Sequence, residues 1–368
     1  MSKKKVIITG SLGYVGSVLA PYLLERGYEV RGFDTGFFKD ALLYPAPQYE
    51  TVTKDVRDIT KEDLRGFDAL VHLAAISNDP LGGVSEEEVY GPTRSYAKTL
   101  ASFCKELGMD FIFASSCSVY GAGSNELIDE GGPVTPLTPY SRNKIAIERE
   151  LAALADGNFN PIAFRFSTAY GISPRMRFDI VINMLVGMAV AKKKIVLNSD
   201  GTAWRPFIHV EDMAHTIERA LVREKTTGLT ILNAGRTEDN FQIRDVASMG
   251  AEALPGTEVS LLGQTELDVR SMELVRDRKV QDGHDKRTYR VSFERIKASL
   301  PDYAPKHTVA TGIPAIAKKL IEMGFSENDF SRTDFYRLQK MEELFREGRI
   351  DRNFRWIKNE LPSSPAAR

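Results

Sequence analysis

Short apolar runs alternate with helix-like segments through the first half of the chain. Val6 to Ile8 is a β-branched run before a glycine-rich turn, and a helical pattern follows from Gly16 to Arg26. Further strands are expected at Glu29–Phe33, Ala69–Leu73, Phe111–Ser115 and Ile162–Phe166, and a helix at Tyr140–Leu154. Because parallel strands need crossover helices, this alternation predicts an α/β fold with a doubly wound parallel sheet.

The pattern becomes irregular beyond Gly171, which predicts a second unit. Residues 172–208 and 237–325 hold isolated helices and short strands, as expected of a smaller substrate-binding lobe over the mouth of the sheet. A helix at Val210–Arg223 is expected to return to the first domain, which would then comprise residues 1–171 and 209–236. The remaining residues, 326–368, predict a helical extension that packs on the body or on a partner subunit.

Composition and charge narrow the function classes. The 368 residues carry a net charge of -1, so no nucleic-acid partner is expected. Two cysteines are too few for a disulfide framework, which favours a cytoplasmic location. The apolar stretch Ile180 to Ala191 is shorter than the roughly 20 residues of a membrane span, so no membrane contact is expected. The histidines are scattered or, like His209 and His215, wrongly spaced for a helical metal pair, so no metal site is expected.

Three glycines mark the junction between the first strand and the first helix. Gly10, Gly13 and Gly16 leave room for a tight turn and for a pyrophosphate group at the helix amino end. The alternative is that they serve only the turn and its packing. The position directly after an amino-terminal strand favours a dinucleotide site.

Two aspartates end the next strands of the same unit. Asp34 closes the second strand, where a carboxylate can accept hydrogen bonds from ribose hydroxyls and would repel a 2′-phosphate, so NAD is favoured over NADP. Its alternative is a turn former. Asp55 is spaced to meet the adenine edge, and a helix cap is its alternative.

A tyrosine and a lysine lie one helical turn apart. Tyr140 and Lys144 share a helix face, where an ammonium group and a positive nicotinamide ring would favour the phenolate. Ser116, at the end of an apolar strand, could hydrogen-bond the reacting oxygen. A surface helix pair and a loop serine are the alternatives. Together with the glycine turn, these residues predict hydride transfer.

These motifs together resemble the extended short-chain dehydrogenase/reductases of the nucleotide-sugar epimerase and dehydratase family over about residues 5 to 325. The resemblance implies a Rossmann-type domain, bound NAD, a nucleotide-diphosphate sugar as substrate and a homodimer. The matching segments are Thr9–Gly16, Asp34, Asp55–Val56, His72–Ala75, Ser115–Gly121, Tyr140–Lys144, Tyr170–Gly171 and Arg205–Asp212.

The resemblance assigns roles at individual positions. Catalysis is expected at Ser116, Tyr140 and Lys144. The residues expected to hold NAD are Gly10, Gly13, Tyr14, Val15, Gly16, Asp34, Asp55, Val56, Leu73, Ala74, Ala75, Ser115, Tyr140 and Lys144. The residues expected to contact substrate are Ser116, Ser118, Arg175, Arg177, Asn183, Arg205 and Arg287. For Arg175 and Arg177, beside Asp179, a structural ion-pair network between the lobes is the alternative.

Absent carboxylates narrow the reaction. Dehydratases of the family carry an Asp-Glu pair where this chain has Cys117 and Ser118, and decarboxylating relatives place Glu at the position of Ser118. Cys117 is therefore expected to be a packing residue. The leading hypothesis is a C4 epimerase with NAD retained through a transient keto sugar. The alternatives are an NAD(H)-exchanging reductase or dehydrogenase and a non-catalytic NAD-binding protein.

Overall fold

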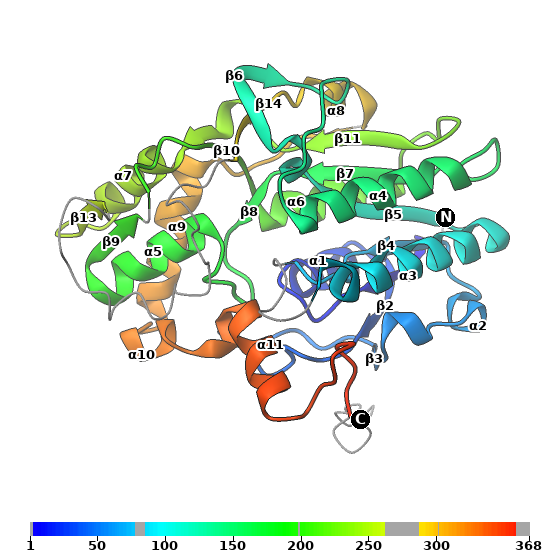
Figure 1. The fold of residues 1–368 in the computed structure, drawn as a ribbon, viewed down its shortest axis with the longest axis horizontal. Coiled ribbons are helices and arrows are strands. Elements are labelled where there is room, and N and C mark those ends of the chain that lie inside the picture. The colour runs from blue at the N-terminus through cyan, green and yellow to red at the C-terminus, as the bar shows by residue number, and fades with distance from the viewer. Residues whose placement is uncertain (1–2, 78–84, 198, 262–286, 301, 358–368) are drawn as a thin grey trace.

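A sheet of seven parallel strands forms the centre of the computed structural model, which describes residues 3–77, 85–197, 199–261, 287–300 and 302–357 (Figure 1). The strand order is β11 (Thr230–Ala234), β7 (Ile162–Phe166), β5 (Asp110–Ser116), β4 (Ala69–His72), β1 (Lys5–Thr9), β2 (Glu29–Asp34) and β3 (Thr51–Thr53). The predicted fold class is confirmed. Strand order reverses between β1 and β4, and ligands bind at the carboxyl ends of the strands beside such a switch point.

Helices cover both faces of the sheet because successive side chains of each strand point to opposite faces. On one face, α1 (Gly16–Glu25) and α6 (Val210–Leu221) pack in one cluster with Ile112. On the other, α3 (Glu86–Leu107) and α4 (Pro139–Leu154) pack in another with Phe111 and Phe113. The short α2 (Lys61–Leu64) lies near the β3 edge. The two-sided burial of β5 explains why its sequence is apolar without alternation.

A second group of elements follows the sheet in the chain and surrounds its own apolar cluster. Its helices are α5 (Val181–Lys192), α7 (Ile243–Ala253) and α9 (Val309–Glu322), and its strands are β8 (Thr168–Tyr170), β9 (Lys194–Leu197), β10 (Trp204–His209), β12 (Asn240–Gln242) and β13 (Glu258–Leu261). β8, β10 and β12 form one small sheet, and β9 pairs with β13. In Figure 1 this group lies at the carboxyl ends of the central strands.

Two segments pack differently from the expected lobe boundaries. β14 (Thr288–Val291) pairs with β6 (Ala122–Ile128), and with α8 (Glu294–Ser299) it contributes to the core of the seven-stranded sheet. α10 (Glu327–Phe330) and the 3-10 turn Thr333–Phe335 pack instead in the cluster of the second group. A pattern of apolar positions shows that a segment is buried, but not which of two cores receives it.

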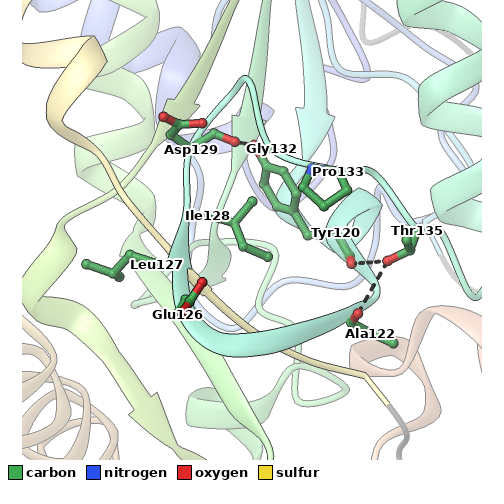
Figure 2. Close-up of a pocket in the computed structure, with 9 residues that line it drawn as sticks. All are labelled: Tyr120, Ala122, Glu126, Leu127, Ile128, Asp129, Gly132, Pro133 and Thr135. Carbon is green, nitrogen blue, oxygen red and sulfur yellow. Dashed lines mark hydrogen bonds between the residues drawn. The ribbon is translucent and has the colours of Figure 1, made fainter.

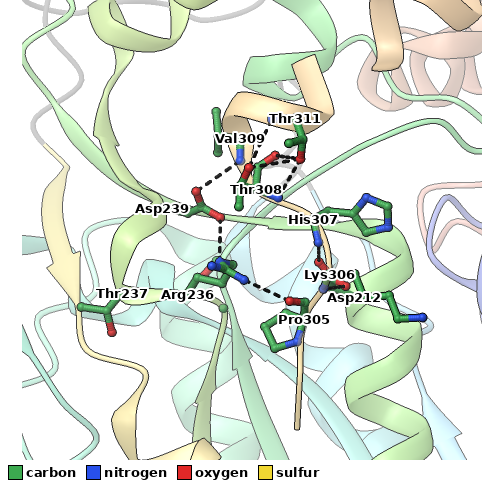
Figure 3. Close-up of polar contacts among 12 residues, drawn as sticks. Asp212, Arg236, Thr237, Asp239, Pro305, Lys306, His307, Thr308, Val309 and Thr311 are labelled. Carbon is green, nitrogen blue, oxygen red and sulfur yellow. Dashed lines mark hydrogen bonds and ion pairs between the residues drawn. The ribbon is translucent and has the colours of Figure 1, made fainter. Parts of the chain in front are cut away.

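A polar clamp joins α6 of the first domain to the start of α9 (Figure 3). The two carboxylate oxygens of Asp212 accept the backbone N–H groups of Lys306, at 2.8 Å, and His307, at 2.9 Å. Nearby, Asp239 accepts the N–H of Val309 at 3.2 Å. The Asp239 bond satisfies a main-chain donor that α9 leaves unpaired at its amino end, and the two Asp212 bonds hold the segment just before the helix.

We predict that Asp212→Ala lowers the free energy of unfolding by about 2 to 3 kcal/mol, because two partly buried N–H donors lose an ionised acceptor. Urea unfolding followed by circular dichroism measures the change. Glu224→Ala, at an exposed position just beyond α6, is the control and should change stability by less than about 0.5 kcal/mol. Equal stability of the two variants would contradict the clamp.

Candidate active site

In the glycine turn after β1, Gly10 and Gly16 are tightly packed, whereas Gly13 faces open space. Gly10 has φ +74°, and a Cβ atom there would lie 2.8 Å from the backbone nitrogen of Ala74. A Cβ on Gly16 would lie 2.4 Å from the carbonyl oxygen of Gly10. At Gly13, apart from its chain neighbours, the only atom of the described residues within 4 Å of an added Cβ is that same oxygen, at 3.1 Å, so a side chain there would fill open space. The turn therefore fits a pyrophosphate over Gly13.

The amino end of α1 offers donors to such a group. Within the described residues, the backbone N–H groups of Tyr14 and Val15 have no hydrogen-bond partner. The side chain of Tyr14 points away, because its hydroxyl donates to the carbonyl of Gly171 at 2.7 Å. Unpaired amides at a helix amino terminus favour an anion.

Asp34 braces the same turn. Its Oδ2 accepts the N–H of Leu12 at 3.0 Å, and its Oδ1 accepts that of Gly36 at 2.7 Å. Burial raises the pKa of Asp34 against these hydrogen bonds and the charges of Arg175 and Arg337. Each carboxylate oxygen has a further lone pair, so the group can still accept a ribose hydroxyl.

Asp55 caps a short 3-10 helix, which was the alternative interpretation, and it also forms an ion pair. Its Oδ1 accepts the backbone N–H of Arg57 at 2.9 Å, and the guanidinium of Arg57 donates to both carboxylate oxygens at 2.8 and 2.5 Å. Burial opposes ionisation, yet these bonds hold the pKa of Asp55 below its usual value. Val56, which follows, is buried. Contact of Asp55 with adenine stays a prediction.

The loop after β4 lies against the glycine turn. The N–H of Leu73 donates to the carbonyl of Thr9 at 3.1 Å, and Ala74 is the residue that leaves no space for a side chain at Gly10. Ala75 follows in the same loop. The predicted dinucleotide residues from three strand ends therefore converge.

Ser116, Tyr140 and Lys144 also come together. Tyr140 lies in the first turn of α4, which begins at Pro139. The side chain of Ser116, at the end of β5, lies close enough to the Tyr140 hydroxyl to act on its pKa. Nζ of Lys144 donates to the carbonyl of Ala114 at 2.6 Å and lies 5.4 Å from the centre of the Tyr140 ring.

Burial shifts the pKa values of two of these three residues, Tyr140 and Lys144, in opposite directions. Burial raises the pKa of Tyr140 to about 12, while the charge of Arg177 and the hydroxyl of Ser116 act to lower it. Burial lowers the pKa of Lys144 to about 8, and Glu148 acts to raise it. At neutral pH the trio is a charged ammonium beside a neutral phenol, so an additional positive charge is needed to make the phenol a base.

A buried network behind β5 was missed by the sequence reasoning. Glu148 and Arg165 form an ion pair, with Nη2 of Arg165 2.8 Å from Oε2, and both side chains are at least 94% buried. Ser115 donates to Oε1 of Glu148 at 2.5 Å, and Arg165 donates to the hydroxyl of Tyr120 at 3.1 Å. Ser115 thus uses its hydroxyl internally. The available signal was the position of Glu148, one helical turn beyond Lys144.

The two residues after Ser116 differ in their surroundings. Cys117 is buried and its thiol donates to the carbonyl of Arg165 at 3.0 Å, and burial raises its pKa far above the ordinary value. Ser118 has a buried hydroxyl without a hydrogen-bond partner in the described part of the chain. Cys117 is a packing residue, as predicted, and Ser118 has an oxygen to offer.

Arg177 and Asn183, both expected to contact substrate, form hydrogen bonds within the protein. Arg177 pairs with Asp179 at 2.8 Å and donates to Ser77 at 3.0 Å. Asn183 is fully buried, its oxygen accepts the N–H of Gly171, and its amino group donates to Tyr14 and to the carbonyl of Arg177. This placement argues against the expected contact of Asn183 with substrate, because its polar atoms are engaged within the protein.

Arg175 and Arg205 differ in how fully their guanidinium groups are hydrogen-bonded within the protein. One nitrogen of Arg175 donates to the carbonyl of Lys39 at 3.3 Å, but its Nε has no partner among the described residues. Arg205 donates to the carbonyls of Trp204, at 2.7 Å, and Arg287, at 2.5 Å. The fold therefore places Arg205 and Arg287 side by side at the start of β14.

Two further features lie away from Ser116, Tyr140 and Lys144. His209 and His307 stack at 3.9 Å, and His307 pairs with Glu211 at 3.2 Å, so the fold gathers three groups of metal-ligand type that the sequence spacing did not suggest. A pocket of about 340 Å³ lies between β6 and the loop before α4 (Figure 2). Tyr120 lines it, but Ser116, Tyr140 and Lys144 do not.

Comparison with known proteins agrees with this geometry. The model of the NAD dependent epimerase/dehydratase family matches residues 6–235. The chain is 29% identical over 268 residues to UDP-glucose 4-epimerase of Corynebacterium glutamicum, covering 67% of this chain and 80% of that enzyme. It is 28% identical over 327 residues to dTDP-glucose 4,6-dehydratase of Streptomyces griseus, covering 84% and 92%.

Solved structures share the fold. UDP-glucuronic acid 4-epimerase of Bacillus cereus, in complex with UDP-glucuronic acid and NAD, has a TM-score of 0.69 at 23% identity, covering 87% of this chain and 99% of that one. An NDP-hexosamine 5,6-dehydratase of tunicamycin biosynthesis has a TM-score of 0.73 at 20% identity, covering 87% and 98%.

The protein belongs to the NAD dependent epimerase/dehydratase family. It is an NAD-dependent enzyme of the short-chain dehydrogenase/reductase class, and the glycine turn fits that cofactor. Within the described residues, no helix is long and apolar enough to cross a bilayer.

We predict that Lys144→Met stabilises the NAD-free protein by about 1 to 3 kcal/mol at pH 7. The pKa of Lys144 in the folded protein is about 8, below the ordinary value of 10.5, so burying the charge weakens the native state below pH 8. Stability contributed by this group rises between about pH 8 and 10.5 as the folded state loses its proton first.

Urea unfolding of wild type and variant from pH 7 to 10 measures the difference, which should shrink as the pH rises. Lys98→Met, at an exposed position of α3, is the control. A Lys144→Met protein that is less stable at pH 7, with a pH-independent difference, would disprove the electrostatic cost.

Proposed function

We propose that this chain is a nucleotide-sugar 4-epimerase. It oxidises C4 of a nucleotide-diphosphate sugar to a transient keto sugar and reduces it again from the other face. The observation that supports this most is the conjunction of Ser116, Tyr140 and Lys144 with Cys117 and Ser118, which supply no carboxylate for eliminating water or assisting decarboxylation.

Each residue has a defined task. Tyr140 takes the proton of the sugar hydroxyl and later returns it, and Ser116 hydrogen-bonds the same oxygen. Lys144, fixed by the Ala114 carbonyl, holds a positive charge beside the phenol and disfavours its protonated form. Bound NAD would supply the acceptor and then the donor of the hydride at the sugar carbon. Burial excludes water from the trio and strengthens these charge effects.

The substrate site is proposed on the open side of this trio. Ser118 offers a hydroxyl that has no hydrogen-bond partner among the described residues. Arg175 lies beside Asp34 and Lys39 instead, and its contact with substrate stays a prediction. Arg205 and Arg287 are proposed to contact the nucleotide diphosphate, since guanidinium groups match phosphate oxygens. Relatives named as nucleotide-sugar 4-epimerases support the substrate class.

An NAD(H)-exchanging reductase uses the same trio, but it is not favoured by these relatives. A non-catalytic NAD-binding protein would have no need of the preserved trio. The homodimer implied by the resemblance and the cytoplasmic location favoured by the low cysteine count stay predictions.

We expect purified enzyme to convert a UDP- or dTDP-linked hexose into its C4 epimer. Nuclear magnetic resonance identifies the epimer, mass spectrometry shows equal mass, and absorbance of the reduced nicotinamide should show no net change. A product lighter by one water would identify a dehydratase. Stoichiometric consumption of added NAD(H) would identify the reductase instead.

We expect Tyr140→Phe to lower kcat by about 10² to 10⁴-fold, because the general base is lost. NAD content after gel filtration should be retained. Tyr22→Phe on α1, whose hydroxyl contacts His215, is the matched control and should keep wild-type kcat. Full activity of Tyr140→Phe would refute the assignment of the base.

A further inference from the structure

The chain after α11 (Arg337–Arg346) folds into a braced segment, and we name residues 350–357 the strap. Ile350 and Trp356 form an antiparallel bridge across it. Oδ1 of Asp351 accepts the N–H groups of Asn353, at 2.8 Å, and Arg355, at 2.9 Å. Such internal bonds give the strap a defined shape of its own.

The strap contacts the loop that follows β2. The indole N–H of Trp356 donates to the carbonyl of Thr35 at 2.7 Å, and its ring centre lies 5.3 Å from that of Phe37. Thr35 directly follows Asp34, which holds the glycine turn through Leu12. Trp356 therefore fastens the loop that carries the proposed ribose ligand.

The strap also contacts the loop that follows β3. Arg57 donates to the carbonyls of Asn353, at 2.6 Å, and Phe354, at 3.1 Å. Arg355 pairs with Asp58 at 2.7 Å. The same Arg57 holds Asp55, so the proposed adenine loop and the strap share one guanidinium.

Apolar burial anchors the strap from beneath. Ile350 and Phe354 are at most 6% exposed and pack with Met341 and Leu344 of α11 and with Tyr90 of α3. Tyr140 lies at the edge of this cluster. In Figure 1, α11 and the segment after it lie beside β2 and β3. The strap thus bridges two neighbouring loops at the edge of the cofactor site and is held by a core of its own.

We propose that the strap retains NAD. The ribose loop after β2 and the adenine loop after β3 are tied together by Trp356, Arg57 and Arg355, so the adenosine half of the cofactor leaves only after these bonds open. This inference rests on NAD binding by the family fold and not on C4 chemistry. A retained cofactor suits a cycle in which the hydride is returned.

The test measures NAD release directly. Wild-type protein loaded with NAD is mixed with excess fluorescent etheno-NAD, and the exchange rate is read from fluorescence. Trp356→Phe keeps an aromatic ring but loses the donor to Thr35, and it should release NAD about five- to tenfold faster. A chain ending at Gly348 should release it at least about 100-fold faster. Ile357→Ala, at an exposed side chain, should match wild type.

Two outcomes would overturn the proposal. Wild-type release rates in Trp356→Phe and in the shortened chain would show that the strap does not retain NAD. Faster and tighter NAD binding by the shortened chain, with unchanged release, would show that the strap obstructs the site. Thermal unfolding of each variant confirms that it is folded, and Trp356→Phe decides the matter if the shortened chain is not. Failure of the C4 assay alone would leave the result standing.

Discussion

The buried ion pair between Glu148 and Arg165 is the interaction on which the arrangement of the active site depends. It joins α4 to β7, while Ser115 and Tyr120 connect it to the end of β5. Removing one member would leave an unpaired charge in a dry interior, which costs several kcal/mol. Lys144, one turn before Glu148, takes its position from the same anchored helix.

That anchoring allows the site to hold an unfavourable arrangement. The phenol of Tyr140 and the ammonium of Lys144 both lie where burial disfavours their charged forms. The packing of α4 on the sheet provides the stability that this arrangement costs, and an oxidised cofactor would supply the missing positive charge. This is the arrangement that the proposed exchange of a proton and a hydride requires.

The same logic extends to the cofactor end. Asp34 accepts hydrogen bonds from Leu12 in the glycine turn and from Gly36 in its own loop. Asp55 accepts one from Arg57, so the groups that would contact adenosine are already ordered. Trp356, far along the chain, holds the same region in place through its hydrogen bond to Thr35. Ordered loops reduce the entropy lost on binding, which favours a cofactor that stays bound.

The sequence by itself determined the local elements and the spacing of the chemistry. Apolar runs such as β5 and the glycine turn at Gly10 to Gly16 act over neighbouring residues, so their period and composition were enough to predict a parallel α/β sheet. The spacing of Tyr140 and Lys144, together with the family resemblance, led to the prediction of a redox site with Ser116. Tertiary structure alone decided that Glu148 meets Arg165, that Asn183 is engaged internally, that β14 joins the first core and that Trp356 reaches Thr35. These are contacts between segments distant in the chain, and hydrophobic patterning shows only that a residue is buried, not which residue it will meet.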